Sequence, residues 1–159
     1  MKKYASLIII ALLAAADQAS KVFALRFLEP VGSADFLPGI LGFRYVENTG
    51  AVFGSFSDST VLLSVITAVV IVVGLALLVM GKFSNKIYLA CAVLIIAGGI
   101  GNLYDRIFRG FVVDFFEFRF MNFAVFNVAD VFVTVGSFTL IIYLIAGLIR
   151  DAKKKEQSA

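Results

Sequence analysis

The sequence has no histidine, only one cysteine and only two prolines among its 159 residues. Without histidine, Ser/His/Asp triads, Cys/His dyads and His-ligated metal sites are excluded. A single cysteine excludes a disulfide scaffold, and 17 phenylalanines with so little proline exclude a disordered chain. Charged residues make up 16% of the chain, too few to cover a water-facing globule, since soluble domains carry about a quarter.

Apolar residues, by contrast, are abundant and reach 61% of the chain. Each of the four longest apolar stretches is near the roughly 20 residues that a helix needs to cross a bilayer. Backbone groups in lipid must pair internally, so helices are expected there. We therefore predict an all-α membrane protein with a small β part, as one domain over residues 1–159. The predicted spans are residues 4–23, 61–80, 87–103 and 128–149, and the external segments are 26–60 and 104–127.

The first apolar stretch also resembles a secretory signal peptide. Lys2 and Lys3 precede it, and three alanines at 14–16 resemble a cleavage site. We favour a retained helix, because the apolar run continues past the charges at Asp17 and Lys21. Cleavage would also leave an unusual bundle of three helices.

The basic residues orient the predicted spans. Eight of the 14 lysines and arginines fall on one side: Lys2, Lys3, Lys82, Lys86, Arg150, Lys153, Lys154 and Lys155. The positive-inside rule places both termini and the loop at 81–86 in the cytoplasm. Any site on the other two loops then lies at the external face of the membrane. The basic C-terminal tail lacks interleaved aromatic residues, so no nucleic-acid partner is expected.

Both external segments carry strand patterns. Residues 41–47 are rich in β-branched and aromatic side chains and end at an Asn/Gly turn signal. Residues 111–120 alternate aromatic and charged side chains near their end, which is the period of a strand. We expect a turn at Met121 and Asn122, a returning strand at 123–126, and packing between the external strands.

Asn102, Asp105 and Arg106 share one face if the third helix continues past residue 103. For Asp105 a structural ion pair at the helix end is favoured over a catalytic role. Arg106 carries a fixed fork of donors that suits a substrate carbonyl or phosphate. Three small residues precede them and permit close helix packing: Gly98, Gly99 and Gly101.

Two further carboxylates have a structural and a functional interpretation. Asp114 lies among apolar residues of a predicted strand, where burial raises a carboxyl pKa; the alternative is a strand residue that points to water, and local spacing does not decide between them. Asn127 and Asp130 have the spacing of a capping box at the start of the fourth helix. A capping carboxylate can also face a site, so these two roles are compatible.

Asp17 and Lys21 are spaced as a helical ion pair in the favourable order. Ionisable groups within spans usually face the bundle interior, although long side chains near a helix end also extend to the interface. We favour a structural pair that borders a site.

Taken together, these stretches resemble the lipoprotein signal peptidases (signal peptidase II) of bacteria. The resemblance covers nearly the whole chain and rests on five segments in order. They are Asp17-Gln-Ala-Ser-Lys21, Asn48-Thr-Gly-Ala-Val-Phe53, Gly98-Gly-Ile-Gly-Asn-Leu-Tyr-Asp-Arg106, Val112-Val-Asp-Phe115 and Phe126-Asn-Val-Ala-Asp130.

The resemblance implies a bacterial cytoplasmic-membrane aspartyl endopeptidase that cleaves prolipoproteins just before the diacylglyceryl-modified cysteine. It also implies a four-helix bundle with an external β-cradle and a short external helix near residues 50–58. The implied catalytic pair is Asp114 and Asp130, without metal or cofactor. The implied substrate-binding or supporting residues are Asn48, Gly50, Asn102, Asp105, Arg106, Asn127, Asp17 and Lys21. We expect a monomer whose partners are lipid-modified prolipoproteins and membrane lipid.

Two functions from other classes remain as alternatives. One is a metal-dependent phospholipid headgroup transferase, because hard carboxylates bind Mg²⁺; it would use Asp17, Asp105, Asp114 and Asp130. The other is a noncatalytic membrane scaffold or proton pathway, in which neutralising Asp114 or Asp130 leaves processing intact. Within the peptidase interpretation, the helix start favours an ionised Asp130 as general base and a protonated Asp114 as acid.

Overall fold

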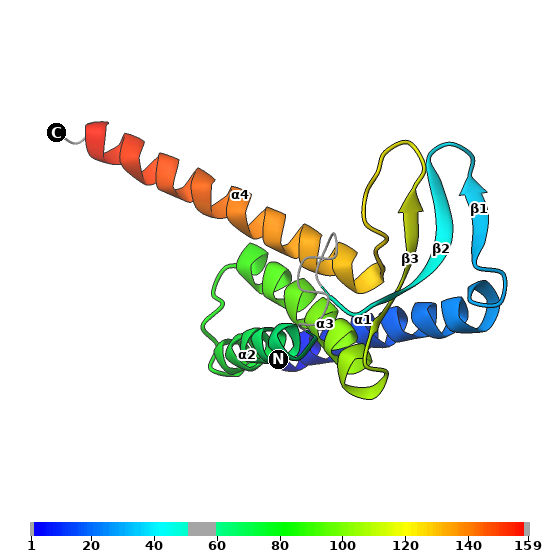
Figure 1. The fold of residues 1–159 in the computed structure, drawn as a ribbon. Coiled ribbons are helices and arrows are strands. Elements are labelled where there is room, and N and C mark those ends of the chain that lie inside the picture. The colour runs from blue at the N-terminus through cyan, green and yellow to red at the C-terminus, as the bar shows by residue number, and fades with distance from the viewer. Residues whose placement is uncertain (1, 51–59, 158–159) are drawn as a thin grey trace.

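The computed structural model describes residues 2–50 and 60–157. Within these, four helices are long and apolar enough to cross a membrane, as predicted (Figure 1). They are α1 (Lys2–Phe23), α2 (Thr60–Val79), α3 (Lys86–Phe108) and α4 (Val128–Gln157). Both α3 and α4 continue beyond the ends that hydropathy alone predicts, so Asn102, Asp105 and Arg106 all lie on α3.

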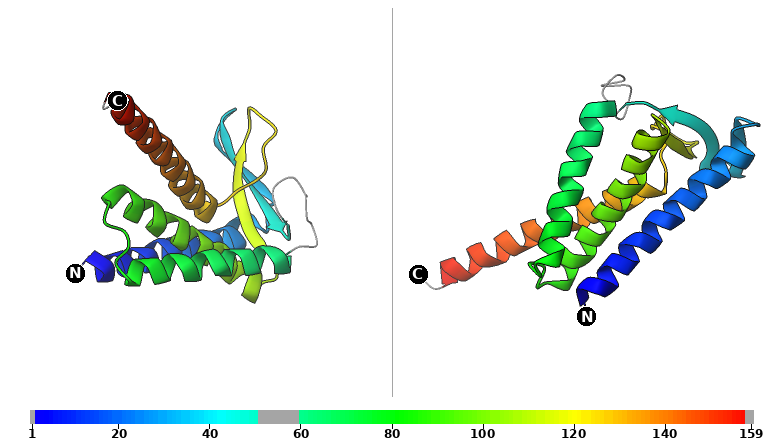
Figure 2. Two further views of the ribbon diagram at one scale, coloured as in Figure 1. Left: turned by 90° about the vertical axis from the view of Figure 1, so that its left-hand side faces the viewer. Right: turned by 90° about the horizontal axis from the view of Figure 1, so that it is seen from below.

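Helix α3 is the centre of the bundle, because it packs against α1, α2 and α4. Two glycines permit this. A Cβ at Gly98 would collide with the carbonyl oxygen of Ala129 in α4, and a Cβ at Gly101 would collide with the carboxylate of Asp17 in α1. The predicted close approach at these small residues is confirmed. In Figure 2, α4 begins beside the sheet and diverges from the other helices towards its C-terminus.

The outer surfaces of the helices remain apolar and exposed. Only 11% of the apolar window of α2 and 6% of that of α4 is buried within the chain. Exposed apolar surface of this extent is not tolerated in water and marks contact with another apolar phase. The chain is therefore a multi-pass membrane protein.

Three antiparallel strands form one sheet in the order β1-β2-β3. They are β1 (Ser33–Leu37), β2 (Leu41–Asn48) and β3 (Val112–Phe118). The predicted strands at 41–47 and 111–120 correspond to β2 and β3, and they pair as expected. Strand β1 was not predicted, because all five of its residues are exposed and leave no alternating pattern.

The predicted strand at 123–126 is wrong. Among the described residues only Phe126 pairs there, in an isolated bridge with Phe116. The two residues exchange backbone hydrogen bonds of 2.8 and 3.0 Å. The ladder ends at this point because Asn127, the next residue, caps α4 and turns the chain into a helix. The short helix expected near residues 50–58 lies outside the described residues, except for Gly50.

A small apolar core fixes the sheet to the first helix. After Phe23 the chain continues into a π-helical turn, η1 (Ala24–Leu28). Ala24 and Leu28 of this turn are buried against Val113 and Phe115 of β3. Burying Leu28, Val113 and Phe115 contributes about 1.5–3 kcal/mol each. Asp114 lies between two buried anchors, so its backbone position is closely determined.

Candidate functional site

Asp114 of β3 and Asp130 of α4 are brought together by the crossing of the sheet and the fourth helix. Only 1% of the Asp114 residue is exposed to solvent. The interpretation of Asp114 as a strand residue that points to water is therefore wrong. Asp130 lies in the first turn of α4, as predicted.

Two asparagines connect these carboxylates. Asn127 donates from Nδ2 to Asp114 Oδ1 at 2.6 Å, and also to Asn102 Oδ1 at 3.1 Å. Asn102 in turn donates from Nδ2 to Asp130 Oδ1 at 2.7 Å. A continuous path of hydrogen bonds therefore runs from one carboxylate to the other.

The capping box at the start of α4 is confirmed. The backbone N–H of Asp130 donates to Asn127 Oδ1 at 2.9 Å, and the backbone N–H of Asn127 donates to Asp130 Oδ2 at 3.1 Å. Reciprocal bonds of this kind satisfy N–H groups that a helix start otherwise leaves unpaired. Asp130 thus caps the helix and also lines a cavity together with Asp114, so the capping role and a place in a site are compatible.

Asn48 approaches Asp114 from the neighbouring strand. In the β2–β3 register Asn48 lies opposite Val112, so it is a diagonal neighbour of Asp114 on the same face. Its Nδ2 donates to Asp114 Oδ2 at 2.8 Å. Its Oδ1 accepts from the backbone N–H of Gly50 at 3.0 Å, which holds the amide in this orientation.

Lys21 extends the site into the bundle. The predicted pair of Asp17 and Lys21 is confirmed with a distance of 3.0 Å between Nζ and Oδ2. The same Nζ lies 3.0 Å from Asp105 Oδ2 and donates to Asn102 Oδ1 at 2.8 Å. Asp17, Lys21 and Asp105 have no solvent exposure. Asp105 is thus a member of a buried ion cluster, which agrees with the structural role favoured from the sequence.

Burial and like charge act on the protonation of Asp114. Burial raises the pKa of Asp114 to about 7, and the negative charge of Asp130 acts in the same direction. Hydrogen bonds from Asn48 and Asn127 act in the opposite direction and moderate the rise. A carboxyl group in this state holds a proton near neutral pH and can give it up.

A cavity of about 530 Å³ contains both carboxylates. Asn48, Gly50 and Arg106 contribute to its polar wall, and three valines of α4 contribute an apolar wall: Val131, Val133 and Val135. Arg106 Nε is buried and has no hydrogen-bond partner among the described residues. A buried guanidinium nitrogen without a partner is costly, and a bound ligand with an acceptor would satisfy it.

A second cavity, of about 550 Å³, is lined by Arg44 and residues 117–124 and contains neither carboxylate. Its charges already pair with one another. Glu117 lies 3.2 Å from Arg44 and 2.6 Å from Arg119, and Arg119 also contacts Asp35. Because this group is neutral as a whole, it offers little attraction to a charged ligand.

Sequence analysis missed two members of the buried cluster. Gln18 donates to Asp105 Oδ1 at 3.1 Å and to the carbonyl oxygen of Gly101 at 3.0 Å. Arg109 forms an ion pair with Asp105 and donates to Gln18 Oε1 at 3.0 Å. The spacing of four between Asp105 and Arg109 carried a signal, but the predicted third span ended at residue 103. Gln18 had no comparable signal.

The four carboxylates named in the metal-dependent alternative divide into two pairs. Asp17 and Asp105 contact Lys21, whereas Asp114 and Asp130 accept from asparagine side chains. Within residues 2–50 and 60–157, no group of three or more His, Cys, Asp or Glu side chains is placed to hold a metal ion.

Comparisons with known proteins identify the family of this chain. Residues 9–146 match the family described as signal peptidase (SPase) II. A lipoprotein signal peptidase of Lactococcus lactis subsp. cremoris (strain SK11) is 39% identical over 145 residues, covering 91% of this chain and 96% of that protein. A lipoprotein signal peptidase of Caldanaerobacter subterraneus subsp. tengcongensis is 41% identical over 137 residues, covering 85% and 92%.

Solved structures share the fold as well. A bacterial membrane enzyme determined by the in meso method at 2.3 Å resolution superposes with a TM-score of 0.80 and 27% identity, over 89% of this chain and 88% of that one. A second such structure, at 1.9 Å resolution, gives a TM-score of 0.78 over 88% and 92%. With a family match over most of its length and a fold shared with solved bacterial membrane enzymes, this chain belongs to the signal peptidase II family of membrane proteases.

Proposed function

We propose that this protein is an aspartyl endopeptidase that cleaves prolipoproteins just before a diacylglyceryl-modified cysteine. Asp114 and Asp130 form its catalytic pair. The observation that supports this most directly is the path through Asn127 and Asn102 that joins the two carboxylates inside one cavity. Family membership supports the same activity.

Asp130 acts as the general base and Asp114 as the general acid. Like charges in close proximity cannot both ionise cheaply, so the pair retains one proton near neutral pH. The ionised Asp130 takes a proton from water as the water attacks the scissile carbonyl carbon. The protonated Asp114 donates to the carbonyl oxygen, and a proton then passes to the leaving amine as the C–N bond breaks.

The remaining residues of the cavity bind the substrate. Arg106 Nε has no partner among the described residues, and we assign it to a carbonyl oxygen of the substrate. Asn48 and Gly50 line the same cavity beside Asp114, and the backbone N–H of Gly50 donates to Asn48 Oδ1. The apolar wall of α4 receives the apolar signal peptide, while the diacylglyceryl chains remain in lipid.

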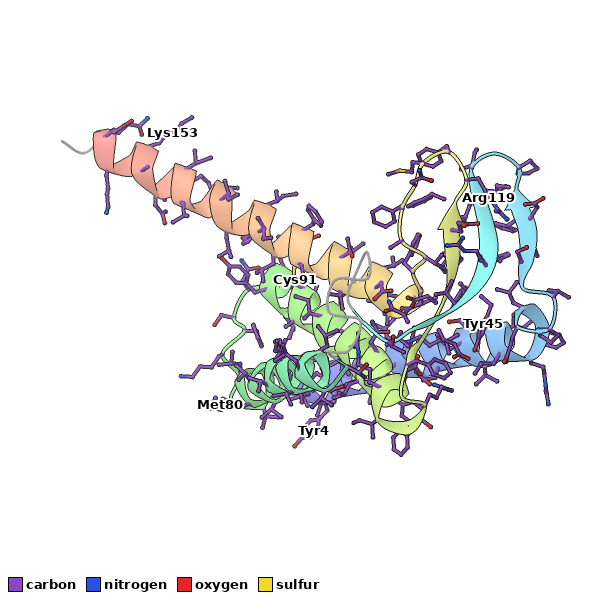
Figure 3. The ribbon with its side chains drawn as sticks, viewed as in Figure 1. Tyr4, Tyr45, Met80, Cys91, Arg119 and Lys153 are labelled. Atoms are coloured by element: carbon purple, nitrogen blue, oxygen red, sulfur yellow. The ribbon has the colours of Figure 1, made fainter. Side chains whose placement is uncertain are left out.

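We propose that both termini lie in the cytoplasm and that the site lies at the external face of the cytoplasmic membrane. Figure 3 supports this orientation, because Met80 and Lys153 lie towards one side of the molecule and Tyr45 and Arg119 towards the other. The lysine-rich ends are thus separated from the sheet. We further propose that the protein acts as a monomer, since one chain supplies every described residue of the site.

Cleavage by purified protein tests this function. A diacylglyceryl-modified prolipoprotein is incubated with the wild-type protein, with and without EDTA, and the products are identified by mass spectrometry. We expect cleavage before the modified cysteine in both conditions, and none with the Asp114→Asn variant. Loss of cleavage in EDTA would contradict a metal-free mechanism, and absence of cleavage in both conditions would favour the two alternative functions. Cleavage by the variant would contradict the proposed catalytic pair.

A further inference from the structure

Two buried carboxylates that do not belong to the catalytic pair hold its backbone on both sides. Asp17 Oδ1 accepts a hydrogen bond of 2.8 Å from the backbone N–H of Ala129. Asp105 Oδ2 accepts one of 3.1 Å from the backbone N–H of Val113. Ala129 is the residue before Asp130, and Val113 is the residue before Asp114.

One ammonium group connects these two carboxylates. Lys21 Nζ lies 3.0 Å from Asp17 Oδ2 and 3.0 Å from Asp105 Oδ2. Its third partner is Asn102 Oδ1 at 2.8 Å. A lysine ammonium has three donors, so all are engaged and none remains for a ligand. The distance between the two carboxylates is therefore set by a single buried atom.

We propose that Asp17, Lys21 and Asp105 form a clamp, and that this clamp sets the spacing of the catalytic carboxyls of Asp114 and Asp130. All three are positioning residues, since they act through Ala129, Val113 and Asn102 rather than on the substrate. The proposal rests on the proposed function, because spacing matters only if the two carboxyls act as a pair.

The clamp also fixes the orientation of the asparagine beside the pair. A lysine ammonium only donates, so Asn102 must present Oδ1 to Lys21 and consequently Nδ2 to Asp130. Asn127 then donates to the same Oδ1. Reversing the Asn102 amide would place donors against Lys21 and Asn127 and would leave Asp130 without its hydrogen bond of 2.7 Å.

The competing explanation is that the cluster only stabilises the fold through its charges. Buried ion pairs are weak evidence for stability, because the cost of desolvation rivals the Coulombic gain. Positioning, by contrast, has a large kinetic consequence, since a displacement of about 1 Å can cost about 100-fold in rate. The two explanations differ in whether the charge or the position of the acceptor atom matters.

Substitutions at Asp105 separate charge from position. Asp105→Asn removes the charge but keeps an oxygen where Val113 N–H and Lys21 need it. Its Nδ2 replaces the Oδ1 that accepts from Gln18 and Arg109, so these two bonds, which lie outside the clamp, are lost. Asp105→Glu keeps the charge but moves the acceptor by one methylene. We expect kcat to fall by about 100-fold in Asp105→Glu and by less than about 10-fold in Asp105→Asn.

A control variant separates the effect of the clamp on kcat from the effect of a general loss of stability. Asn85→Ala removes the N-cap of α3, whose side chain accepts from the backbone N–H of Ile87 at 2.7 Å at the opposite end of that helix. It should lower the melting temperature without changing kcat per folded molecule. KM should change little in both Asp105 variants, because the clamp does not touch the substrate.

The order of the two Asp105 variants decides the inference. If Asp105→Asn loses more kcat than Asp105→Glu, or if neither differs from the wild type, the clamp does not set the spacing and the inference is wrong. Should Asp105→Glu fail to fold, Asp17→Glu against Asp17→Asn gives the same comparison through Ala129. The wild-type protein in the same assay keeps the outcomes separate, because absence of wild-type cleavage contradicts the proposed function itself.

Discussion

Asn127 donates a hydrogen bond of 2.6 Å to Asp114, and through this bond the start of a membrane helix is joined to a strand of the external sheet. The same side chain caps α4 through its oxygen. Because Nδ2 of the Asn127 amide binds Asp114 and Oδ1 of the same amide caps α4, both atoms fix the orientation of the amide. A substitution at this position therefore separates the stability of the helix from the chemistry of the site.

We predict that Asn127→Asp retains the cap and loses the donor. Asp is a good N-cap residue, so the melting temperature should fall less than in Asn127→Ala, where loss of the cap costs about 0.5–2 kcal/mol. The new carboxylate lies against Asp114, so kcat should fall by at least about 10-fold in the Asp variant. Thermal unfolding and steady-state kinetics on the same preparations measure the two effects. A fully active Asn127→Asp variant would show that the donor is dispensable.

Neutralising either member of the proposed pair should abolish cleavage. We expect Asp114→Asn and Asp130→Asn each to lose about 10²–10⁴-fold in kcat, the usual contribution of a positioned acid or base. The helix content by circular dichroism should not change, because Asn is nearly isosteric with Asp. Substantial turnover by either folded variant would contradict the assignment of the pair and favour the noncatalytic alternative.

The protonation of Asp114 predicts a loss of activity on the alkaline side. Its pKa is raised to about 7, and it must be protonated to donate, so kcat/KM should fall about 10-fold per pH unit above that value. The profile reports the coupled pair rather than one residue. A rate that stays constant from pH 6 to about pH 9 would exclude an acid of this kind.

The same shift predicts how stability depends on pH. The native state keeps the Asp114 proton up to about pH 7, whereas an unfolded chain releases it near pH 4. The native state thus binds more protons in this interval, and its stability declines as pH rises through it. Asp114→Asn should flatten this decline in a series of thermal melts.

Lipid modification of the substrate should strongly favour cleavage. Phe36 of β1 is exposed, as are Phe120 and Phe123 in the segment that follows β3, and exposed aromatic residues suit contact with lipid at the interface. We expect kcat/KM to be at least about 10-fold higher for the diacylglyceryl form than for the unmodified prolipoprotein. Equal values for the two forms would contradict this part of the proposed function.

The proton in the free enzyme should reside mainly on Asp114. Asp130 lies at a helix start, where the dipole stabilises an anion by about 0.3–1 kcal/mol. Infrared difference spectra of isotope-labelled carboxyl groups near neutral pH test this. A protonated-carboxyl band that disappears in Asp130→Asn but persists in Asp114→Asn would show that the roles are reversed.

Local sequence patterns alone predicted much of the secondary structure and contacts within single helices. Hydropathy over about 20 residues predicted the four helices, strand-forming residues with a turn signal predicted β2, and alternation predicted β3. The Asn127 and Asp130 capping box and the Asp17–Lys21 pair were predicted because residues three and four apart are neighbours within a helix turn. These features depend on backbone geometry that every helix and strand shares.

Only the tertiary structure decided which of these local features meet. The contacts from Lys21 to Asp105, from Asn48 to Asp114 and from Asp17 to Ala129 join different elements across 66 or more residues. The first and the last of these contacts depend on how closely α3 approaches α1 and α4, which Gly98 and Gly101 permit, whereas the second depends on the pairing of β2 with β3. Sequence periodicity predicts which face of a helix is buried. Which residue of a neighbouring element meets that face depends on the crossing angle of helices and the register of strands, and these arise only when the elements pack.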